Sequence, residues 1–531
     1  MTTPSLAMIP TGFKAGKLYS VLPEPIYGSE LVTNGDFATD TDWTKGTGWT
    51  ISGGSANCDG TSGLLNQNIP TLIAGKMYKW TFEITSYTSG SVKFYSGSGS
   101  DDAIYKSSVG TFTQYFIAES NLKYVYSNSF NGSIDNLSVK EVRVGDGDFD
   151  VTRATTATRI NEQGLIESMA NNVPRLDYTD GGCPVLLTEP QSTNIITYSE
   201  DFSNGSYAKS RIVVTSNNTT SPDGTINADK IIATAVSGTH FSTLSPTVTS
   251  GIPYTLSLFV KSAEYDWVTI MMQGAGWVGS SKSISFNSTT GVFGTVSAGI
   301  TYSSKSLTNG WYKLSITNTT AATSANVRIY PTPSDSELSY TGDGTSGVYM
   351  YGAQAEALPY ATSYIPTNGS TVTRVKDVVN NAGDVNTFNS EEGVLFVELG
   401  TLTNTPSSDL KLGISDGTNN NRIQIWFKTT TNQIRLVIIS DTGVSVLLTY
   451  TLTDTKLLNK FAIVWSLGVQ QLWVNGSIVL SDTDNFTFNT NTLNTLDLTD
   501  TNGTNPFFGK TKQLKVYKSI AEAQIDLPYI T

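Results

Sequence analysis

The sequence predicts an all-β protein built of tandem β-sandwich (jelly-roll) domains. Short runs alternate β-branched or aromatic side chains with polar ones, as in Lys79-Trp-Thr-Phe-Glu-Ile84 and Trp311-Tyr-Lys-Leu-Ser-Ile316. This period of two is typical of strands with one buried face. Gly-rich turns such as Thr341-Gly-Asp-Gly-Thr345 separate the runs, a pattern that favours sandwiches and jelly rolls. Sustained helical periodicity is missing, and short helices are expected only at residues 519–525 and around residues 160–169.

The composition bounds the size and the class of the protein. The 531 residues suggest about three or four domains. With 33 basic and 45 acidic residues the net charge is −12, which argues against nucleic acid or anionic membranes as partners. One histidine and two cysteines are too few for a His-based metal centre, a zinc site or a disulfide framework. No apolar run reaches the ~20 residues of a membrane span, and the first residues do not resemble a signal peptide, so we expect no membrane insertion and synthesis in a cytoplasm.

An internal repeat sets the first boundaries. One copy begins with Glu30-Leu-Val-Thr-Asn-Gly-Asp-Phe37, and the other begins with Asn194-Ile-Ile-Thr-Tyr-Ser-Glu-Asp-Phe202. Each copy is followed by a similar segment, Val151-Thr-Arg-Ala154 or Val372-Thr-Arg-Val375. Because structural repeats keep their period along a chain, we expect two related sandwiches. The predicted organisation is an N-terminal segment (1–29), a first jelly roll (30–143), a connector (144–193), a second jelly roll (194–366) and a linker (367–389).

The remaining residues, 390–531, predict a third sandwich. Lys460-Phe-Ala-Ile-Val-Trp465 and Gln471-Leu-Trp-Val-Asn-Gly-Ser-Ile-Val-Leu480 both read as strands. The Asn475-Gly476 pair inside the second run predicts a two-residue hairpin of type I′, because both central positions of that turn need positive φ.

These stretches resemble known families. The opening Thr33-Asn-Gly-Asp-Phe37 and the closing Ile134-Asp-Asn-Leu-Ser-Val139 resemble the first and last strands of carbohydrate-binding-module jelly rolls. Residues 194–366, with Tyr351-Gly-Ala-Gln-Ala-Glu356, resemble modules of bacteriophage head- and tail-fibre proteins. Residues 390–531 resemble the laminin-G/concanavalin-like lectin fold, on the hairpin Leu472-Trp-Val-Asn-Gly476.

The most specific resemblance lies in the N-terminal segment and the connector. Met8-Ile-Pro-Thr-Gly-Phe-Lys-Ala-Gly-Lys-Leu-Tyr-Ser-Val-Leu-Pro23 and Gly145-Asp-Gly-Asp-Phe-Asp-Val-Thr-Arg-Ala154, continuing through Arg175-Leu-Asp-Tyr178 and Leu186-Leu-Thr-Glu-Pro190, resemble phage structural proteins. In those proteins the two stretches are commonly close together, so the first jelly roll resembles an insertion between them. The resemblance implies a virion protein that docks through these segments onto other virion structural proteins, assembles in the host cytoplasm and forms a homo-oligomer, with a trimer favoured.

Candidate sugar-binding residues are aromatics next to hydrogen-bonding groups. A sugar has an apolar face that packs on an aromatic ring and a polar edge that needs hydrogen bonds. Trp267 and Trp277 flank the segment Met271-Met-Gln-Gly-Ala-Gly276, and Trp426 shares a predicted strand with Arg422 and Gln424. Each tryptophan has the alternative role of a sandwich core residue.

The resemblance to carbohydrate-binding modules also implies a structural calcium site. In that family a Ca²⁺ often lies where the first and last strands meet, and Asp36 and Asp135 occupy the matching positions. Carboxylate oxygens suit Ca²⁺. The alternative is ordinary strand pairing with an Asx turn, which leaves the protein without a cofactor.

The sequence does not predict an enzyme. Concanavalin-like glycosidases usually carry Glu-x-Asp-x-x-Glu on one strand, and that pattern is missing around Glu398. Glu391 and Glu392 are adjacent and would lie on opposite faces of a strand. His240 has no nucleophile motif beside it.

The interpretation we favour is a phage head or tail fibre that displays lectin-like domains and adheres to host surface polysaccharide. One alternative is a purely structural capsid-decoration or collar protein without sugar binding. The other is a bacterial surface adhesin.

Overall fold

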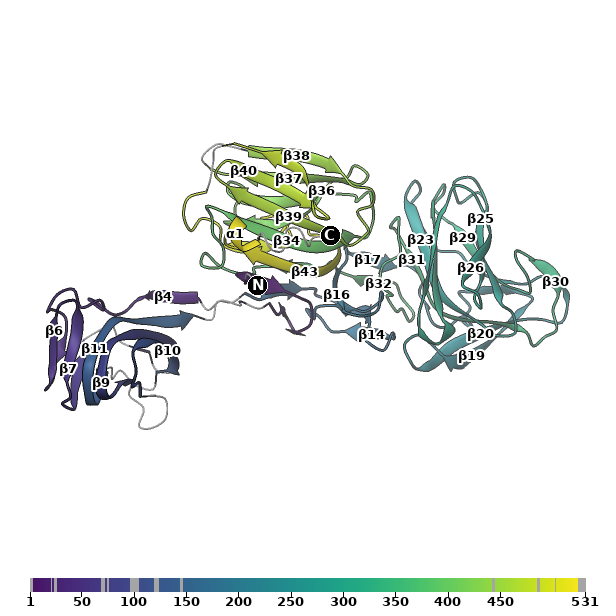
Figure 1. Ribbon diagram of the computed structural model, residues 1–531. Helices are drawn as coiled ribbons and strands as arrows, with labels where there is room; N and C mark the ends of the chain where they lie inside the picture. The colour runs from purple at the N-terminus through teal and green to yellow at the C-terminus, as the bar shows by residue number, and fades with distance from the viewer. Residues whose placement is uncertain are drawn as a thin grey trace. The chain divides into compact units, whose positions relative to one another are not determined.

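The structure is a computed structural model that describes residues 3–20, 22, 26–67, 72–73, 76–95, 105–118, 124–143, 147–441, 445–484, 488–501 and 503–523. These residues form an all-β protein, as the sequence predicts, with one short α-helix, α1 (Ile520–Ala523), and one 3-10 helix, η1 (Thr308–Gly310) (Figure 1). None of the helices among the described residues is long and apolar enough to cross a bilayer. The chain divides into two compact units, Glu24–Gly145 and Met1–Pro23 together with Asp146–Thr531.

The unit Glu24–Gly145 is a bent eight-stranded sheet around its own core. The two long strands, Met77–Tyr95 and Tyr124–Arg143, pair with each other along most of their length. Bulges in Tyr124–Arg143 let this strand also pair with three shorter strands, one after another. Trp49, Trp80 and Phe130 are buried in the core, and Trp43 packs against it. The strands are β4 (Ile26–Glu30), β5 (Thr44–Lys45), β6 (Trp49–Ser52), β7 (Ser55–Asp59), β8 (Gly63–Asn66), β9 (Met77–Tyr95), β10 (Gly110–Ile117) and β11 (Tyr124–Arg143).

The second sandwich has two six-stranded sheets with the core between them. One sheet has the order β18 (Ala208–Ser210), β22 (Phe241–Leu244), β29 (Asn326–Thr332), β24 (Trp267–Gln273), β25 (Lys282–Asn287) and β26 (Val292–Val296). The other has the order β19 (Ile212–Thr220), β20 (Ile226–Ala233), β31 (Gly347–Glu356), β23 (Pro253–Ser262), β28 (Tyr312–Thr319) and β27 (Thr301–Ser306). Two further strands, β21 (Ser237–Thr239) and β30 (Ser339–Thr341), form a separate two-stranded sheet. Alternate residues of β24, Val268, Ile270 and Met272, are fully buried in the core.

The third sandwich packs a five-stranded sheet on an eight-stranded sheet. The five-stranded sheet has the order β38 (Ser445–Thr451), β37 (Gln433–Ile439), β36 (Arg422–Phe427), β35 (Leu410–Ser415) and β42 (Thr495–Asp497). The eight-stranded sheet has the order β15 (Leu176–Asp177), β16 (Val185–Thr188), β43 (Gly509–Tyr517), β34 (Gly393–Thr401), β39 (Asn459–Ser466), β40 (Val469–Val474) and β41 (Ser477–Asp482), and β1 (Leu6–Met8) also pairs with β43. The predicted hairpin is confirmed, because Asn475 and Gly476 join β40 to β41 with φ of 46° and 83°.

The N-terminal segment and the connector are parts of this fold. Leu6 and Met8 of β1 and Leu186 of β16 belong to the core of the third sandwich. Strand β1 pairs with residues 514–516 of β43, and β16 pairs with residues 509–511. A four-stranded sheet joins the two segments in the order β2 (Phe13–Lys14), β3 (Lys17–Leu18), β12 (Phe149–Thr152) and β33 (Val378–Asn380). Their docking role stays a prediction.

Two local predictions need correction. The helix expected around residues 160–169 is a hairpin of β13 (Ala157–Ile160) and β14 (Ile166–Met169), because Asn161 and Gly164 form a tight turn between them. The linker 367–389 is packed: β32 (Val372–Arg374) pairs with β17 (Ser192–Asn194), and Arg374 and Asp377 are buried. Of the helix expected at residues 519–525, α1 accounts for the middle, and residues 524–525 lie outside the described residues.

Candidate functional site

Strand β36 brings three predicted sugar-binding residues to one surface. Ile423, Ile425 and Phe427 point into the core and are at most 1% exposed. Since successive side chains of a strand alternate between faces, the side chains of residues 422, 424 and 426 lie on the outward side of the five-stranded sheet. The alternation that the sequence predicts for this strand is therefore present. Gln424 is only 1% exposed, so its prediction as a sugar-binding residue is wrong and its role is to support Trp426 from below.

Neighbouring strands add cations to the same face. Lys411 of β35 and Arg435 of β37 lie directly opposite Trp426 on either side, and Lys428 follows β36. We name this surface the Trp426 face; it consists of Lys411, Arg422, Gln424, Trp426, Lys428 and Arg435. The sequence alone did not identify the three added residues. Lys411 and Arg435 join the face through strand register, which is a long-range property, whereas Lys428 lies two residues after Trp426 and was overlooked.

The indole of Trp426 is half-buried and is held in a ring of cations. Its Nε1 donates a hydrogen bond to Gln424 Oε1 at 2.9 Å. The distances from the ring centre are 3.9 Å to Lys411 Nζ, 5.4 Å to Lys428 Nζ and 5.8 Å to Arg422 Cζ. Such contacts are favourable because the ring face carries negative charge density.

Asp500 anchors the buried side of this arrangement. It accepts hydrogen bonds from Lys411 Nζ at 2.6 Å and from Gln424 Nε2 at 3.5 Å. Burial alone would raise the pKa of Asp500, but the bond and charge of Lys411 overcome it and the pKa is lowered. Gly413 lies opposite Gln424, and a Cβ there would approach Gln424 Cγ to 2.8 Å. The missing side chain thus lets Gln424 pack closely on β35.

The lysines and arginines of the Trp426 face differ in their partners. Lys411 is paired with Asp500, and Lys428 is paired with Asp409. Arg422 donates to Asn419 Oδ1, and Arg435 Nε donates to Thr449 Oγ1 at 3.3 Å. Within the described part of the chain, neither arginine forms an ion pair with a carboxylate. The two arginines therefore keep donor groups free for a ligand.

The two tryptophans predicted on the second sandwich lie elsewhere. Trp267 begins β24 and is half-buried on the outward side of its sheet. Trp277 is only 3% exposed and belongs to the core, where its Nε1 donates to the carbonyl of Asn326 at 2.9 Å. Its prediction as a sugar-stacking residue is wrong, because the Gly-rich turn before it folds the ring back between the sheets.

The proposed calcium ligands lie at turns of the other unit. The first and last strands do meet, since β11 pairs with β4, and Leu137 N of β11 donates to the carbonyl of Gly35 in the turn after β4 at 2.8 Å. Asp36 accepts from the backbone of Ala38, and Asp135 accepts from that of Asn136. No cluster of three or more His, Cys, Asp or Glu suited to a metal occurs in the residues that the structure describes. Calcium stays a prediction for this pair.

The residues weighed for catalysis are engaged in packing. His240 is fully buried, with Nδ1 2.6 Å from the carbonyl oxygen of Arg211 and its ring 4.5 Å from that of Tyr340. Glu398 accepts from Lys512 Nζ at 3.0 Å and from Gln513 Nε2 at 2.7 Å. That the protein is no enzyme stays an expectation.

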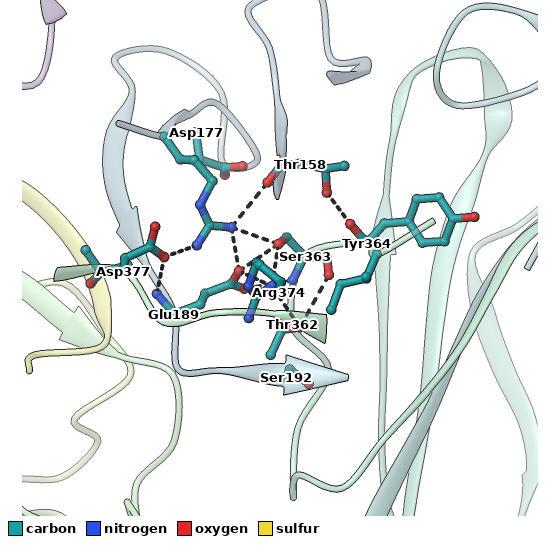
Figure 2. A network of polar contacts seen from close by, with 12 residues as sticks. Thr158, Asp177, Glu189, Ser192, Thr362, Ser363, Tyr364, Arg374 and Asp377 are labelled. Carbon is teal, nitrogen blue, oxygen red and sulfur yellow. Dashed lines mark hydrogen bonds and ion pairs between the residues drawn. The ribbon is translucent and has the colours of Figure 1, made fainter. Parts of the chain in front are cut away.

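A buried network of charges joins the connector to the rest of its unit (Figure 2). Asp377 is paired with Arg153 at 2.9 Å and with Arg175. Glu189 is paired with Arg175 at 2.5 Å and with Arg374 at 2.8 Å. All five side chains are at most 3% exposed. The two arginines of the repeated Val-Thr-Arg segments thus meet in one network, and that repeat was the only sequence signal for it.

Residues of the second sandwich complete the network. Ser363 donates its backbone N–H to Glu189 Oε1 at 2.7 Å and accepts from Arg175 at 2.8 Å. Thr158 of β13 donates to the carbonyl of Tyr364 at 2.6 Å (Figure 2). Burial alone would raise the pKa of Glu189, but the charges of Arg374 and Arg175 dominate and hold that pKa well below its usual range.

Cavities adjoin the second sandwich. One, of about 250 Å³, lies beside the network, where residues of the connector (Asp177), the second sandwich (Phe259, Lys313) and the third sandwich (Lys510) line it. The second, of about 430 Å³, is an acidic cleft lined by Tyr198, Glu200, Asp201, Asn217, Asp229 and Asn368 among others. Its lining includes no basic residue.

Comparisons with known proteins assign no family. No known protein family matches the chain, and no curated protein matches it. Among solved structures, it is similar to the N-terminal CBM22-1–CBM22-2 tandem domain of Paenibacillus barcinonensis Xyn10C, with 11% identity over 62% of this chain and 97% of that chain, and a TM-score of 0.21. This identity and this score are too low to assign a function.

Proposed function

We propose that this protein binds glycans through the Trp426 face and serves as a head or tail fibre of a tailed phage that adheres to host surface polysaccharide. The observation that carries the glycan proposal is a half-buried indole flanked by hydrogen-bonding and charged side chains on an outward sheet face. The apolar side of a sugar ring packs on an indole, and guanidinium groups hydrogen-bond its hydroxyls. All these groups stand on rigid strands, which favours a preformed site.

The virion role is supported by the sequence resemblance of the N-terminal segment and the connector to phage structural proteins. In this role the partners are other virion proteins and host polysaccharide, the location is the virion, and several copies, with a trimer favoured, raise the avidity of a weak sugar site. Immunogold labelling of purified particles with antibody against residues 390–531 tests it. Gold at the ends of projections supports a fibre, and gold against the capsid or collar supports the decoration alternative.

A matched pair of tryptophans tests the glycan site. Trp473 on β40 is also half-buried and also donates its Nε1 to a glutamine two residues earlier, Gln471, at 3.0 Å. It lies on the opposite sheet, and no cation–π contact to it occurs among the described residues. In a glycan array with the full chain, Trp426→Ala is expected to weaken binding about tenfold or more, because the ring loses its packing on the sugar. Trp473→Ala should leave binding unchanged.

Two results would count against this assignment. Equal binding by both variants would place the site elsewhere, with the 430 Å³ acidic cleft as the next candidate. No binding of the original protein to any glycan would favour the purely structural alternative. Circular dichroism of each variant verifies that a loss of binding is not a loss of folding.

A further inference from the structure

We propose that the Trp426 face selects anionic polysaccharides, whose carboxylate or sulfate groups pair with Arg422 and Arg435. This inference rests on the proposed glycan site and names the chemical class of its ligand.

The first argument is the local balance of charge. Four cations surround the indole, whereas the whole chain carries a net charge of −12. Asp500 and Asp409 neutralise Lys411 and Lys428, the two lysines. Asp497 is 5% exposed and accepts a hydrogen bond from the backbone of Asn381. Two further carboxylates, Asp416 and Asp441, lie in the loops after β35 and β37; Asp416 accepts from the side chain of Asn421, and the backbone of Asp441 donates to that side chain. The two arginines are the cations of this face that form no ion pair among the described residues, so they carry the positive charge offered to a ligand.

The second argument is the unused donor capacity of these arginines. A guanidinium carries five N–H donors in a planar fork that matches a carboxylate or sulfate. Arg422 uses NH1 for Asn419, its Nε is buried out of reach of a ligand, and its NH2 forms no hydrogen bond among the described residues. Among the described residues Arg435 forms one hydrogen bond, which its Nε donates to Thr449 Oγ1. A ligand anion would satisfy donors that the protein leaves open, and charge-assisted bonds of this kind are the stronger class.

Both arginines lie beside the indole. Arg435 lies directly across from Trp426 on β37, and the guanidinium carbon of Arg422 lies 5.8 Å from the centre of the Trp426 ring. The acidic groups of a glycan that packs on the indole would therefore lie within reach of both guanidinium groups.

The acidic cleft on the second sandwich has the opposite charge and is unsuited to an anionic ligand. Its carboxylates are Glu200, Asp201 and Asp229, and no basic residue lines it. Like charges would repel an anionic polymer there. Binding of polyanions should therefore not involve this cleft.

The experiment measures binding of the full chain to polygalacturonate and to the same polymer after methyl esterification, which removes its charge and keeps its backbone. Dextran sulfate and neutral dextran form a second matched pair that distinguishes sulfate from carboxylate. We expect a charged polymer to bind at least tenfold more tightly than its neutral counterpart, and this preference to shrink between 50 and 500 mM salt, because screening weakens the ion pairs.

Variants connect the preference to the two arginines. The double variant Arg422→Gln, Arg435→Gln should lose the preference for charge, and Lys456→Gln, an exposed lysine in the loop before β39, should keep it. Equal binding of charged and neutral polymers by the original protein, with loss of both in Trp426→Ala, would overturn the inference and leave the glycan proposal standing. Preference for polyanions that the double variant retains would also overturn it. The inference would also be overturned if the protein bound none of the four polymers and the glycan array found only neutral ligands. If neither experiment found any ligand, both the inference and the glycan proposal would be contradicted.

Discussion

Two buried carboxylates of this chain have opposite pKa shifts, and the difference lies in their partners. Glu189 is surrounded by arginines, so its charged form is stabilised and its pKa is lowered. Asp497 has no ion-pair partner among the described residues: its contacts are the backbone N–H of Asn381 at 2.7 Å and the hydroxyl of Thr495 at 3.3 Å. Burial therefore dominates and raises the pKa of Asp497 to about 6.

The substitution Asp497→Asn is expected to stabilise the third sandwich above pH 6. The folded state binds a proton on Asp497 more tightly than the unfolded state does, so stability from this group is present below pH ~4 and is lost as pH rises through about 6. Removing the charge should recover up to about 3 kcal/mol at pH 7.5, because an amide oxygen can still accept from Asn381. The measurement is the midpoint of thermal unfolding at pH 7.5 and at pH 4.

The control for Asp497 is Asp500, three residues later in the loop after β42. Asp500→Asn removes a carboxylate whose pKa is lowered by Lys411, so it should destabilise the protein at pH 7.5. If both substitutions shifted the midpoint in the same direction, the contrast between a paired and an unpaired carboxylate would be contradicted.

At the scale of elements, local chemistry could be predicted from the sequence and long-range register could not. The Asn475-Gly476 hairpin and the alternation of β36 depend on neighbouring residues alone, and both follow from the sequence. The hairpin of β13 and β14 was missed although its turn is local: Asn161 Oδ1 accepts from the backbone of Gln163 and Leu165, and Gly164 has φ of 77°. That Asx turn was the overlooked signal.

The candidate site likewise contains residues that the sequence predicts locally and residues that only long-range strand pairing brings in. Arg422, Gln424 and Trp426 share one strand and were predicted together, while Lys411, Arg435 and Asp500 depend on strand pairing. The burial of Trp277 depends on how the two sheets enclose its turn, which no short pattern specifies. In the charge network, Arg153 and Asp377 are 224 residues apart, so a single sequence cannot pair them.

Strand β1 supplies a prediction at this scale. Leu6 is fully buried in the core of the third sandwich, while Ile9, just after the strand, is 50% exposed. Leu6→Ala should therefore lower the free energy of unfolding by about 2–5 kcal/mol, because it leaves a cavity. Ile9→Ala should change that free energy by about 0.5 kcal/mol or less. Chemical denaturation followed by tryptophan fluorescence measures both, and equal small effects would show that β1 is not part of the core.

At the scale of the whole molecule, the buried charge network determines how the connector is held to its unit. Its members come from the connector, from the end of the second sandwich and from the segment before the third sandwich. A buried ion pair is a poor source of net stability, but removing one partner leaves an uncompensated buried charge. The network therefore penalises any arrangement in which these segments separate.

Acid should weaken this connection. The lowered pKa of Glu189 means that its stabilisation is fully present above the unfolded value of about 4.3 and is lost as pH falls below it. Glu189→Gln should lower the free energy of unfolding by about 3–5 kcal/mol at pH 7 and should remove part of the acid sensitivity of the original protein.

Glu167→Gln is the matched control, since Glu167 pairs with Arg159 at 2.8 Å but its side chain is 42% exposed. It should lower the free energy of unfolding by about 1 kcal/mol or less. Limited proteolysis within residues 147–193 at pH 7 and pH 3.5 reports the opening directly. Cleavage that rises equally in both variants would show that the connector is held by its apolar contacts rather than by these charges.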